Sequence, residues 1–255
     1  MNTKDPKNER LAKVIARAGI CSRREAERRI LGGRVKLDGK VILTPAINIT
    51  PRNEVRIDGK LLPSREPTRL WRYHKPIGLL TTTKDPKGRP TIFDRLPDSL
   101  PRVISVGRLD INTEGLLLVT NDGELARKLE LPATGWSRRY RVRVYGFVDK
   151  NKLETLKNKN IIDGVQFGAI TATLDRQQGA NAWLTLSLSE GKNREIRKIL
   201  EYNGWPVNRL IRTAYGPFQL GNLQKGAITE VSKKVICEQL NIKTPGERSG
   251  AHHRW

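Results

Sequence analysis

The segment from Gly107 to Gly123 constrains the fold of this 255-residue chain strongly, because it sets an acidic side chain, Asp110, beside Arg108 and just before an apolar run. Its sequence is GRLDINTEGLLLVTNDG. The apolar run Leu116–Val119 predicts a short buried strand, and Asn121-Asp122-Gly123 predicts the turn that ends it. Asp110 is therefore expected in an irregular segment just before a rigid strand. Taken alone, this local pattern favours a simple surface ion pair between Asp110 and Arg108.

The net charge limits the kinds of partner that this chain can have. A formal charge of +22 makes a compact protein repel itself unless a polyanion neutralises it, and nucleic acid is the natural candidate. An anionic membrane surface is the alternative. However, no apolar run approaches the roughly 20 residues of a spanning helix, and the basic N-terminus lacks the apolar core of a signal peptide. We therefore expect a soluble, cytoplasmic protein.

Cysteine and histidine are too sparse for most metal and nucleophile chemistry. Cys21 and Cys237 lie far apart without a CxxC companion, which argues against a disulfide framework or a zinc knuckle. Of three histidines only His74 lies in the body of the chain, so a His-based metal site or a Ser-His-Asp triad is not expected. Neither a GxxxxGK[ST] loop nor a GxGxxG turn after a strand is present. An enzyme of this sequence is expected to work without cofactor or metal.

The first 63 residues, with 15 Lys or Arg against 7 Asp or Glu, are expected to form a unit of their own. Ser22 and Glu25 form a capping box that predicts a helix ending at Gly32-Gly33. An earlier helix is predicted over Arg10 to Ala18 from its apolar spacing. Asp-Gly turns at 38–39 and 58–59 each predict a β-hairpin. The expected architecture is two short helices and a small sheet.

Five basic side chains fall on or beside the capped helix and predict a cationic face for phosphates: Arg17, Arg23, Arg24, Arg28 and Lys36. An ordinary solvated helix face is the alternative. The segment resembles the small RNA-binding domain called the alpha-L domain, through LAKVIARAG, SRREA and GRVKLDG. Pro63 to Pro67 is interpreted as a linker. We therefore predict an RNA-binding domain over 1–63, a second domain over 64–243 and a disordered tail over 244–255.

The second domain mixes short β-type runs with helices, without the regular alternation of a parallel βαβ sheet. This pattern predicts an α+β fold. Arg139 to Tyr145 alternates cleanly and predicts a strand, with Tyr140 placed among cations as in RNA-stacking sites. Packing of Tyr140 on the sheet is an equally good interpretation. Thr81 to Asp94 is rich in Lys, Pro, Gly and Thr and predicts a long, mobile, basic hairpin loop.

A second polar motif, EGKNREIRKIL, spans residues 190–200. Asn193 is the expected N-cap of a helix that stops at Gly204. Arg197 falls at the edge of its buried face, where a partly desolvated guanidinium favours a carboxylate partner. A snorkelling edge arginine is the more common meaning of such a pattern.

Together, these segments resemble the RsuA/RluB family of pseudouridine synthases from about Trp71 to Ser232. The resemblance is carried by GRLDINTEGLLLVTNDG, KPIG, EGKNREIRKIL, VNRLIR, YGP and the spacing of Leu220, Leu223 and Gly226. It implies the pseudouridine synthase fold, with a mixed, largely antiparallel central sheet flanked by helices. It also implies that Asp110 is the catalytic aspartate, Tyr140 the active-site tyrosine and Arg197 the basic partner of the aspartate. Where the family commonly has Lys two residues before the tyrosine, this chain has Arg138.

The resemblance suggests supporting roles for further residues of the motifs. Arg108, Lys192 and Arg194 are expected to contact RNA. Thr113, Glu114 and Asn121 are expected to hold the catalytic residues in place without contacting the substrate. The implied reaction isomerises uridine to pseudouridine in ribosomal RNA by base flipping and aspartate-dependent chemistry. It needs no cofactor. Large-subunit RNA, free or in a pre-ribosomal particle, is the favoured substrate, with no membrane partner and a monomeric enzyme.

Two other functions compete with this interpretation. A non-catalytic RNA-binding or ribosome-assembly protein that retains the fold is the stronger rival. A hydrolase using Asp110 as glycosidases do is weaker, because no second carboxylate is evident as its partner.

Overall fold

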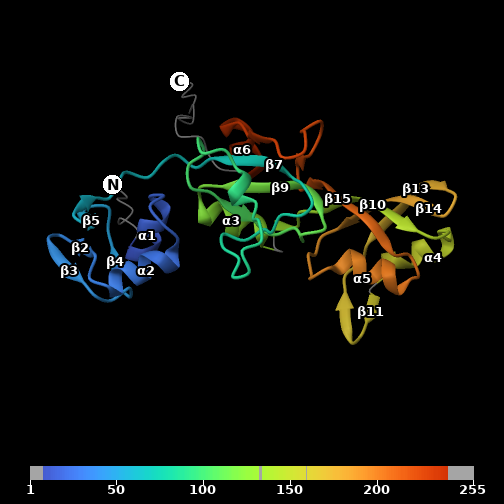
Figure 1. The fold of residues 1–255 in the computed structure, drawn as a ribbon, viewed down its shortest axis with the longest axis horizontal. Helices are drawn as coiled ribbons and strands as arrows, with labels where there is room; N and C mark the ends of the chain where they lie inside the picture. The colour runs from blue at the N-terminus through green and yellow to red at the C-terminus, as the bar shows by residue number, and fades with distance from the viewer. Residues whose placement is uncertain (1–7, 132–133, 159, 241–255) are drawn as a thin grey trace, which may run out of the picture. The chain divides into compact units, whose positions relative to one another are not determined.

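The structure is a computed structural model that describes residues 8–131, 134–158 and 160–240. The chain divides into two compact units (Figure 1). The first comprises the chain up to Thr68 together with Asp98–Ile104 and Asn121–Gly123, and the second comprises the rest. The domain boundaries at 63 and 243 stay predictions, and the tail over 244–255 lies outside the described residues.

The first unit contains the two predicted helices, α1 (Leu11–Arg17) and α2 (Arg23–Leu31), and a four-stranded sheet. The sheet order is β3-β2-β5-β6, and a further short pair joins β1 to β4. The strands are β1 (Glu9–Arg10), β2 (Val35–Leu37), β3 (Lys40–Ile42), β4 (Asn48–Ile49), β5 (Val55–Ile57) and β6 (Lys60–Leu61). Both Asp-Gly turns adopt positive φ at each residue, as the tight turn of a hairpin requires.

The capping box of α2 is only half formed. The Glu25 backbone N–H donates to Ser22 Oγ at 3.2 Å, which satisfies one free amide of the first turn. The Glu25 carboxylate pairs with Arg28 and Arg29 of the same helix. The Glu25 carboxylate pairs with these arginines instead of accepting from the Ser22 N–H, because hydrogen bonds between charged groups are stronger than one to a neutral amide.

The second unit is built on a mixed sheet with the order β13-β14-β10-β15-β9-β7-β17, to which β8 and β16 add at the side (Figure 1). Along the order from β13 to β17, every neighbouring pair is antiparallel except β9 with β15, and β16 is antiparallel to β15. The α+β fold with a largely antiparallel sheet is therefore confirmed. The strands are β7 (Leu70–Lys75), β8 (Ile104–Val106), β9 (Glu114–Thr120), β10 (Arg138–Tyr145), β13 (Thr171–Gln178), β14 (Asn181–Leu188), β15 (Val207–Tyr215), β16 (Phe218–Gln219) and β17 (Ile228–Glu230).

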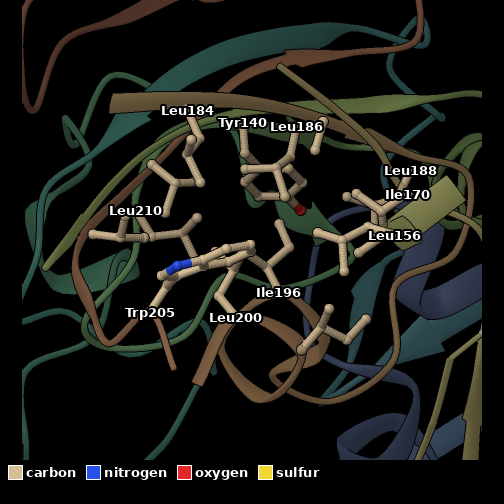
Figure 2. Packing of buried hydrophobic residues seen from close by; sticks show 14 of the residues in the cluster. Tyr140, Leu156, Ile170, Leu184, Leu186, Leu188, Ile196, Leu200, Trp205 and Leu210 are labelled. Carbon is tan, nitrogen blue, oxygen red and sulfur yellow. The ribbon is translucent and has the colours of Figure 1, made fainter. Parts of the chain in front are cut away.

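Helices and a hairpin complete this unit. The α-helices are α3 (Gly123–Glu130), α4 (Lys150–Glu154), α5 (Glu195–Tyr202) and α6 (Lys233–Leu240); the hairpin is β11 (Asn160–Ile162) with β12 (Val165–Phe167), and 3-10 turns cover η1 (Phe93–Arg95) and η3 (Thr155–Lys157). Strand β10 alternates buried and exposed residues along its length. Its buried side packs with α5, as Figure 2 shows for Tyr140 beside Leu186 and near Ile196.

Gly115 permits the parallel pairing of β9 with β15. Its Cα is in register with Arg212, its φ is +109°, and a Cβ added there would lie 2.3 Å from the Arg212 carbonyl oxygen. No larger residue fits without separating the strands. The glycine of the TEG sequence is therefore required by the close approach of two backbones.

Two local predictions are wrong. Helix α5 begins at Glu195 instead of following an Asn193 cap, because Arg194 adopts the left-handed conformation with φ +51° and breaks the helical path. Segment 81–94 is not a strand-flanked hairpin. An isolated bridge joins Leu80 to Thr91, and the 3-10 turn η1 (Phe93–Arg95) overlaps the end of the segment.

Candidate active site

Asp110 lies in the loop that joins β8 to β9, and its side chain is half-buried. Across the described residues, neither a hydrogen bond nor an ion pair engages its carboxylate. The surface ion pair with Arg108 is not formed, and Arg108 is exposed to solvent. The carboxylate is therefore available to a ligand.

The backbone around Asp110 is held at five successive residues. Thr81 Oγ1 donates to the Leu109 carbonyl, the Gly78 N–H to the Ile111 carbonyl and Arg197 Nη2 to the Asn112 carbonyl, each at 2.8 Å. Lys75 binds the carbonyls of Asp110 and Thr113. Within the loop, the Thr113 N–H donates to the Asp110 carbonyl at 3.0 Å. A loop fixed in this way presents its one free carboxylate in a defined direction.

Lys75, at the end of β7, supplies the central anchor of this loop. Its side chain is fully buried, and Nζ donates to the carbonyls of Thr113 at 2.9 Å, Asp110 at 3.1 Å and Pro76 at 3.0 Å. Burial lowers the pKa of Lys75 to about 8, against the opposing effect of the Asp110 and Glu114 charges. Lys75 was part of the KPIG motif, but its role could not be inferred from sequence.

Arg197 approaches Asp110 through the backbone instead of pairing with its carboxylate. The guanidinium is buried on α5 and donates to Val207 O at 3.1 Å and to Asn112 O at 2.8 Å. Among the described residues no ion pair joins the Arg197 guanidinium to the Asp110 carboxylate, and the role of Arg197 as the basic partner of Asp110 stays a prediction. Burial and the neighbouring Arg194 lower the pKa of Arg197, whereas the charge of Asp110 acts in the opposite direction. The two groups therefore interact electrostatically without a direct hydrogen bond.

Tyr140 belongs to the apolar cluster that also contains Leu109 and Ile196. These are the neighbours of Asp110 and Arg197 in the sequence. Only 9% of Tyr140 is exposed, and its ring lies beside Leu186 (Figure 2). Tyr140 therefore packs in the core that also holds the sequence neighbours of Asp110 and Arg197, which agrees with the alternative that Tyr140 packs on the sheet.

Glu114 and Thr113 continue the loop into β9 as buried residues. Burial raises the pKa of Glu114, but Arg209 and Lys225 outweigh this effect and the net shift is downward. Arg209 Nε lies 2.5 Å and Lys225 Nζ 3.0 Å from its carboxylate oxygens. Asn121 lies at the other end of β9, where its Nδ2 donates to the Pro67 carbonyl at 2.9 Å. Glu114 and Thr113 therefore adjoin the Asp110 loop, and Asn121 does not.

The predicted RNA-contacting residues differ in how they are held. Lys192 Nζ donates to the Gln166 carbonyl at 2.6 Å and pairs with Glu190 at 2.9 Å, whereas Arg194 is exposed. In the first unit, Arg17 is bound bidentately by Glu9 and is largely buried. The other four members of the predicted face are exposed: Arg23, Arg24, Arg28 and Lys36.

The described residues hold neither a metal-ion cluster nor a membrane span. They contain no group of three or more His, Cys, Asp or Glu side chains arranged to hold a metal ion. They also include no helix whose length and apolar character would let it cross a lipid bilayer.

Comparison with known proteins agrees with this geometry. Residues 69–202, which include Asp110, Tyr140 and Arg197, match the family model of RNA pseudouridylate synthase. The chain belongs to the RNA pseudouridylate synthase family. Residues 9–55 match the S4 domain, which corresponds to the predicted alpha-L segment.

Relatives of known sequence support the same assignment over nearly the whole chain. An uncharacterised RNA pseudouridine synthase of Rickettsia prowazekii is 50% identical over 234 residues, which cover 91% of this chain and 97% of the relative. The ribosomal large subunit pseudouridine synthase B of Escherichia coli is 46% identical over 231 residues, covering 88% and 79%. A crystal structure of a pseudouridylate synthase aligns with a TM-score of 0.63 and 25% identity, over 90% of this chain and 99% of the other. As a pseudouridylate synthase, the protein acts on uridine in RNA.

Proposed function

We propose that this synthase converts a uridine of large-subunit ribosomal RNA to pseudouridine, with Asp110 as the catalytic carboxylate. One observation carries the assignment of Asp110: its loop is fixed at five successive residues while its carboxylate remains unpaired. The similarity to a large-subunit enzyme of Escherichia coli supports the choice of RNA. A non-catalytic RNA-binding protein would have no need of such a fixed, unpaired acid.

The reaction breaks the bond between N1 and C1′ and forms a bond between C5 and C1′. The C5 proton leaves and N1 gains a proton, so the product is an isomer and neither an oxidant nor a hydrolytic water is consumed. Asp110 initiates the reaction by covalent attack on the sugar or on the base, or by removing the ribose 2′ proton. All of these routes require an ionised carboxylate aimed at the flipped nucleotide.

Arg197 and Tyr140 have different tasks in this proposal. Arg197 is a positioning residue, because its two hydrogen bonds fix the Asn112 carbonyl behind Asp110 and the start of β15. Its charge also opposes protonation of the carboxylate. Tyr140 offers an aromatic ring to the detached uracil and a hydroxyl close to C5, where it assists removal of the proton.

The first unit is proposed to bind RNA phosphates through Arg23, Arg24, Arg28 and Lys36. These side chains are exposed on or near α2. Arg17 is excluded from this set because its side chain is largely buried in the bidentate pair with Glu9, whereas Arg23 and Arg28 stay exposed although each also has an acidic partner. We further propose a monomeric enzyme that acts in the cytoplasm on free RNA or on a pre-ribosomal particle, without a membrane partner and without cofactor.

Replacement of Asp110 tests the proposed function. Unmodified large-subunit RNA of Escherichia coli, made by transcription, is incubated with the protein, and pseudouridine is mapped by chemical probing. Asp110→Asn is expected to lower the rate by at least about 10³-fold with RNA affinity unchanged. Asp98→Asn, at an exposed carboxylate outside the site, is the control and should retain full activity. Absence of pseudouridine with the unsubstituted protein refutes the reaction, and equal activity of Asp110→Asn refutes the role of Asp110.

A conservative change separates the charge of Arg197 from its hydrogen bonds. Arg197→Lys keeps the cation but cannot reach two carbonyls in the geometry of a guanidinium. The single-turnover rate at saturating enzyme should fall by about 10- to 100-fold, while the dissociation constant for RNA stays the same. A full rate in Arg197→Lys would mean that charge alone is required.

A further inference from the structure

Strand β10 carries arginines on the side that faces away from Tyr140. Tyr140, Val142 and Val144 are buried in the core that α5 covers. The residues that alternate with them along the strand are exposed, and three of these are Arg139, Arg141 and Arg143. Because side chains of a strand alternate between the two faces of a sheet, these arginines lie on the reverse face of the sheet. Figure 1 shows α5 and β11 together on one side of β10.

The arginine row continues across the neighbouring strands. Arg143 is directly opposite Arg209 of β15 on one side and Trp183 of β14 on the other. Trp183 is in turn opposite Arg176 of β13. We call the surface made by these side chains the arginine face; its members are Arg139, Arg141, Arg143, Arg176, Arg209 and Trp183.

This arrangement works against the stability of the sheet. Like charges directly opposite one another across two strands repel, and Arg143 with Arg209 is such a pair. The four strands that form the face offer one acid to offset this charge, Asp175, which accepts a hydrogen bond from the Thr185 hydroxyl at 2.8 Å. Like charges face each other across the strands without a packing benefit, and such a departure from the rules of sheet stability is typical of a functional surface.

Protein contacts satisfy only part of the arginine face. Arg209 pairs with Glu114 at 2.5 Å, and the Arg141 guanidinium stacks 4.6 Å from the centre of the Trp183 ring. For the guanidinium groups of Arg139, Arg143 and Arg176, the described part of the chain provides neither a hydrogen bond nor an ion pair. Their fifteen N–H donors, five on each guanidinium, are open to an external anion.

We propose that the arginine face is a second RNA-binding surface, which takes phosphates of the substrate RNA away from the target uridine. Guanidinium groups match phosphate oxygens in charge and geometry. An anionic membrane is the poorer match, because the members of the face are five arginines and one tryptophan, over which the Arg141 guanidinium stacks, and none of them is an aliphatic side chain that could enter a bilayer. The inference extends the proposed function, since it names a further contact for the same RNA.

The salt dependence of RNA binding tests the arginine face. The triple variant R139Q/R143Q/R176Q removes the three unpartnered guanidinium groups. The matched control K150Q/K157Q/K233Q removes the same charge from exposed lysines outside the face. Binding of the unmodified Escherichia coli large-subunit transcript is measured by filter retention between 0.05 and 0.5 M KCl, after thermal melting has shown that each variant is folded.

Each lost phosphate contact lowers the slope of log affinity against log salt by about 0.7 to 0.9. The triple arginine variant is therefore expected to lose about two slope units, and R139K/R143K/R176K to recover most of them. Pseudouridine formation at saturating enzyme should keep its single-turnover rate, while kcat/KM falls by at least about tenfold at 0.1 M salt. A slope equal to that of the lysine control overturns the proposal. So does loss of binding to phosphatidylglycerol vesicles with an unchanged RNA slope.

These outcomes are independent of the proposed reaction. If the unsubstituted protein forms no pseudouridine, the proposed function fails, but the slope still reports on the arginine face. If pseudouridine forms and the slope does not change, the arginine face fails alone.

Discussion

The Asp110 loop and the arginine face use their polar groups in opposite ways. In the loop, protein donors bind the carbonyls of Leu109, Asp110, Ile111, Asn112 and Thr113. On the arginine face, three guanidinium groups have no protein acceptor among the described residues. Groups that must be aimed at a reacting atom are fixed by the protein, whereas groups that follow a flexible polyanion are left for that polyanion to bind.

The largest expected effect tests the rigid half of this comparison at Gly115. In Gly115→Ala, the new Cβ would lie 2.3 Å from the Arg212 carbonyl oxygen at a φ of +109°. The free energy of unfolding should fall by more than about 3 kcal/mol, because two backbones must separate. Gly107→Ala is the control from the same motif; its φ is +67° and nothing lies within 4 Å of the added Cβ. It should cost about 1 kcal/mol. Equal losses in urea unfolding would contradict the close approach.

The second effect concerns the amine that holds the loop. Lys75→Met leaves the buried carbonyl of Thr113 without its side-chain donor and the carbonyl of Asp110 with the Thr113 N–H alone. We expect a loss of about 2 to 3 kcal/mol in urea unfolding and a lower single-turnover rate. RNA affinity should be unchanged, which separates this variant from those on the arginine face. If the rate is retained, the loop does not need its anchor for catalysis.

The third effect is a pH dependence that only the fixed region should show. Burial lowers the pKa of Lys75 from 10.5 to about 8. Between pH 8 and about 10 the unfolded chain therefore binds more protons than the folded chain, so stability from this group rises as pH rises. Urea unfolding at pH 7.5 and 9.5 should show a gain of about 1 kcal/mol relative to Lys75→Met. A loss relative to that variant over the same interval would mean that the amine is stabilised in its charged form.

The smallest effect tests whether an unpartnered arginine contributes to RNA binding in the first unit as well. Arg24 is exposed, and it has no hydrogen bond or ion pair among the described residues. Arg24→Gln should lower the salt slope by less than one unit and weaken binding about fivefold at 0.1 M salt. Arg34→Gln is the control, because Asp58 already neutralises Arg34 at 2.6 Å. Identical slopes for the two variants would remove α2 from the RNA-contacting surfaces.

Local sequence signals predicted those elements whose causes are local. Alternation predicted β10, and the Ser22 hydroxyl and the Asp-Gly turns set the start of α2 and the two hairpins of the first unit. The prediction failed at Asn193, because a left-handed Arg194 cannot be recognised from residue type.

The sequence named the residues of the candidate site but not the hydrogen bonds that hold them. Asp110, Tyr140 and Arg197 were named from motifs, and Tyr140 packs in the core that also holds the sequence neighbours of the other two. Arg197 lies 85 residues from Asn112 in sequence. Its contact with the Asn112 carbonyl, instead of the Asp110 carboxylate, depends on how α5 packs against β15. The role of Lys75 depends in the same way on the pairing of β7 with β9. Such contacts are tertiary, so no periodicity within one segment reports them.

The pairing of β9 with β15 also bears on when during its synthesis this protein becomes active. Arg212 must meet Gly115, and β17 near the C-terminal end must pair with the strand that carries Lys75. Contacts between such distant segments form late, because the intervening chain has to be ordered first. A nascent chain therefore carries Asp110 out of the ribosome long before its surroundings exist. An enzyme that modifies the RNA of ribosomes should thus stay inactive during its own synthesis at least until β17 has emerged and paired with β7.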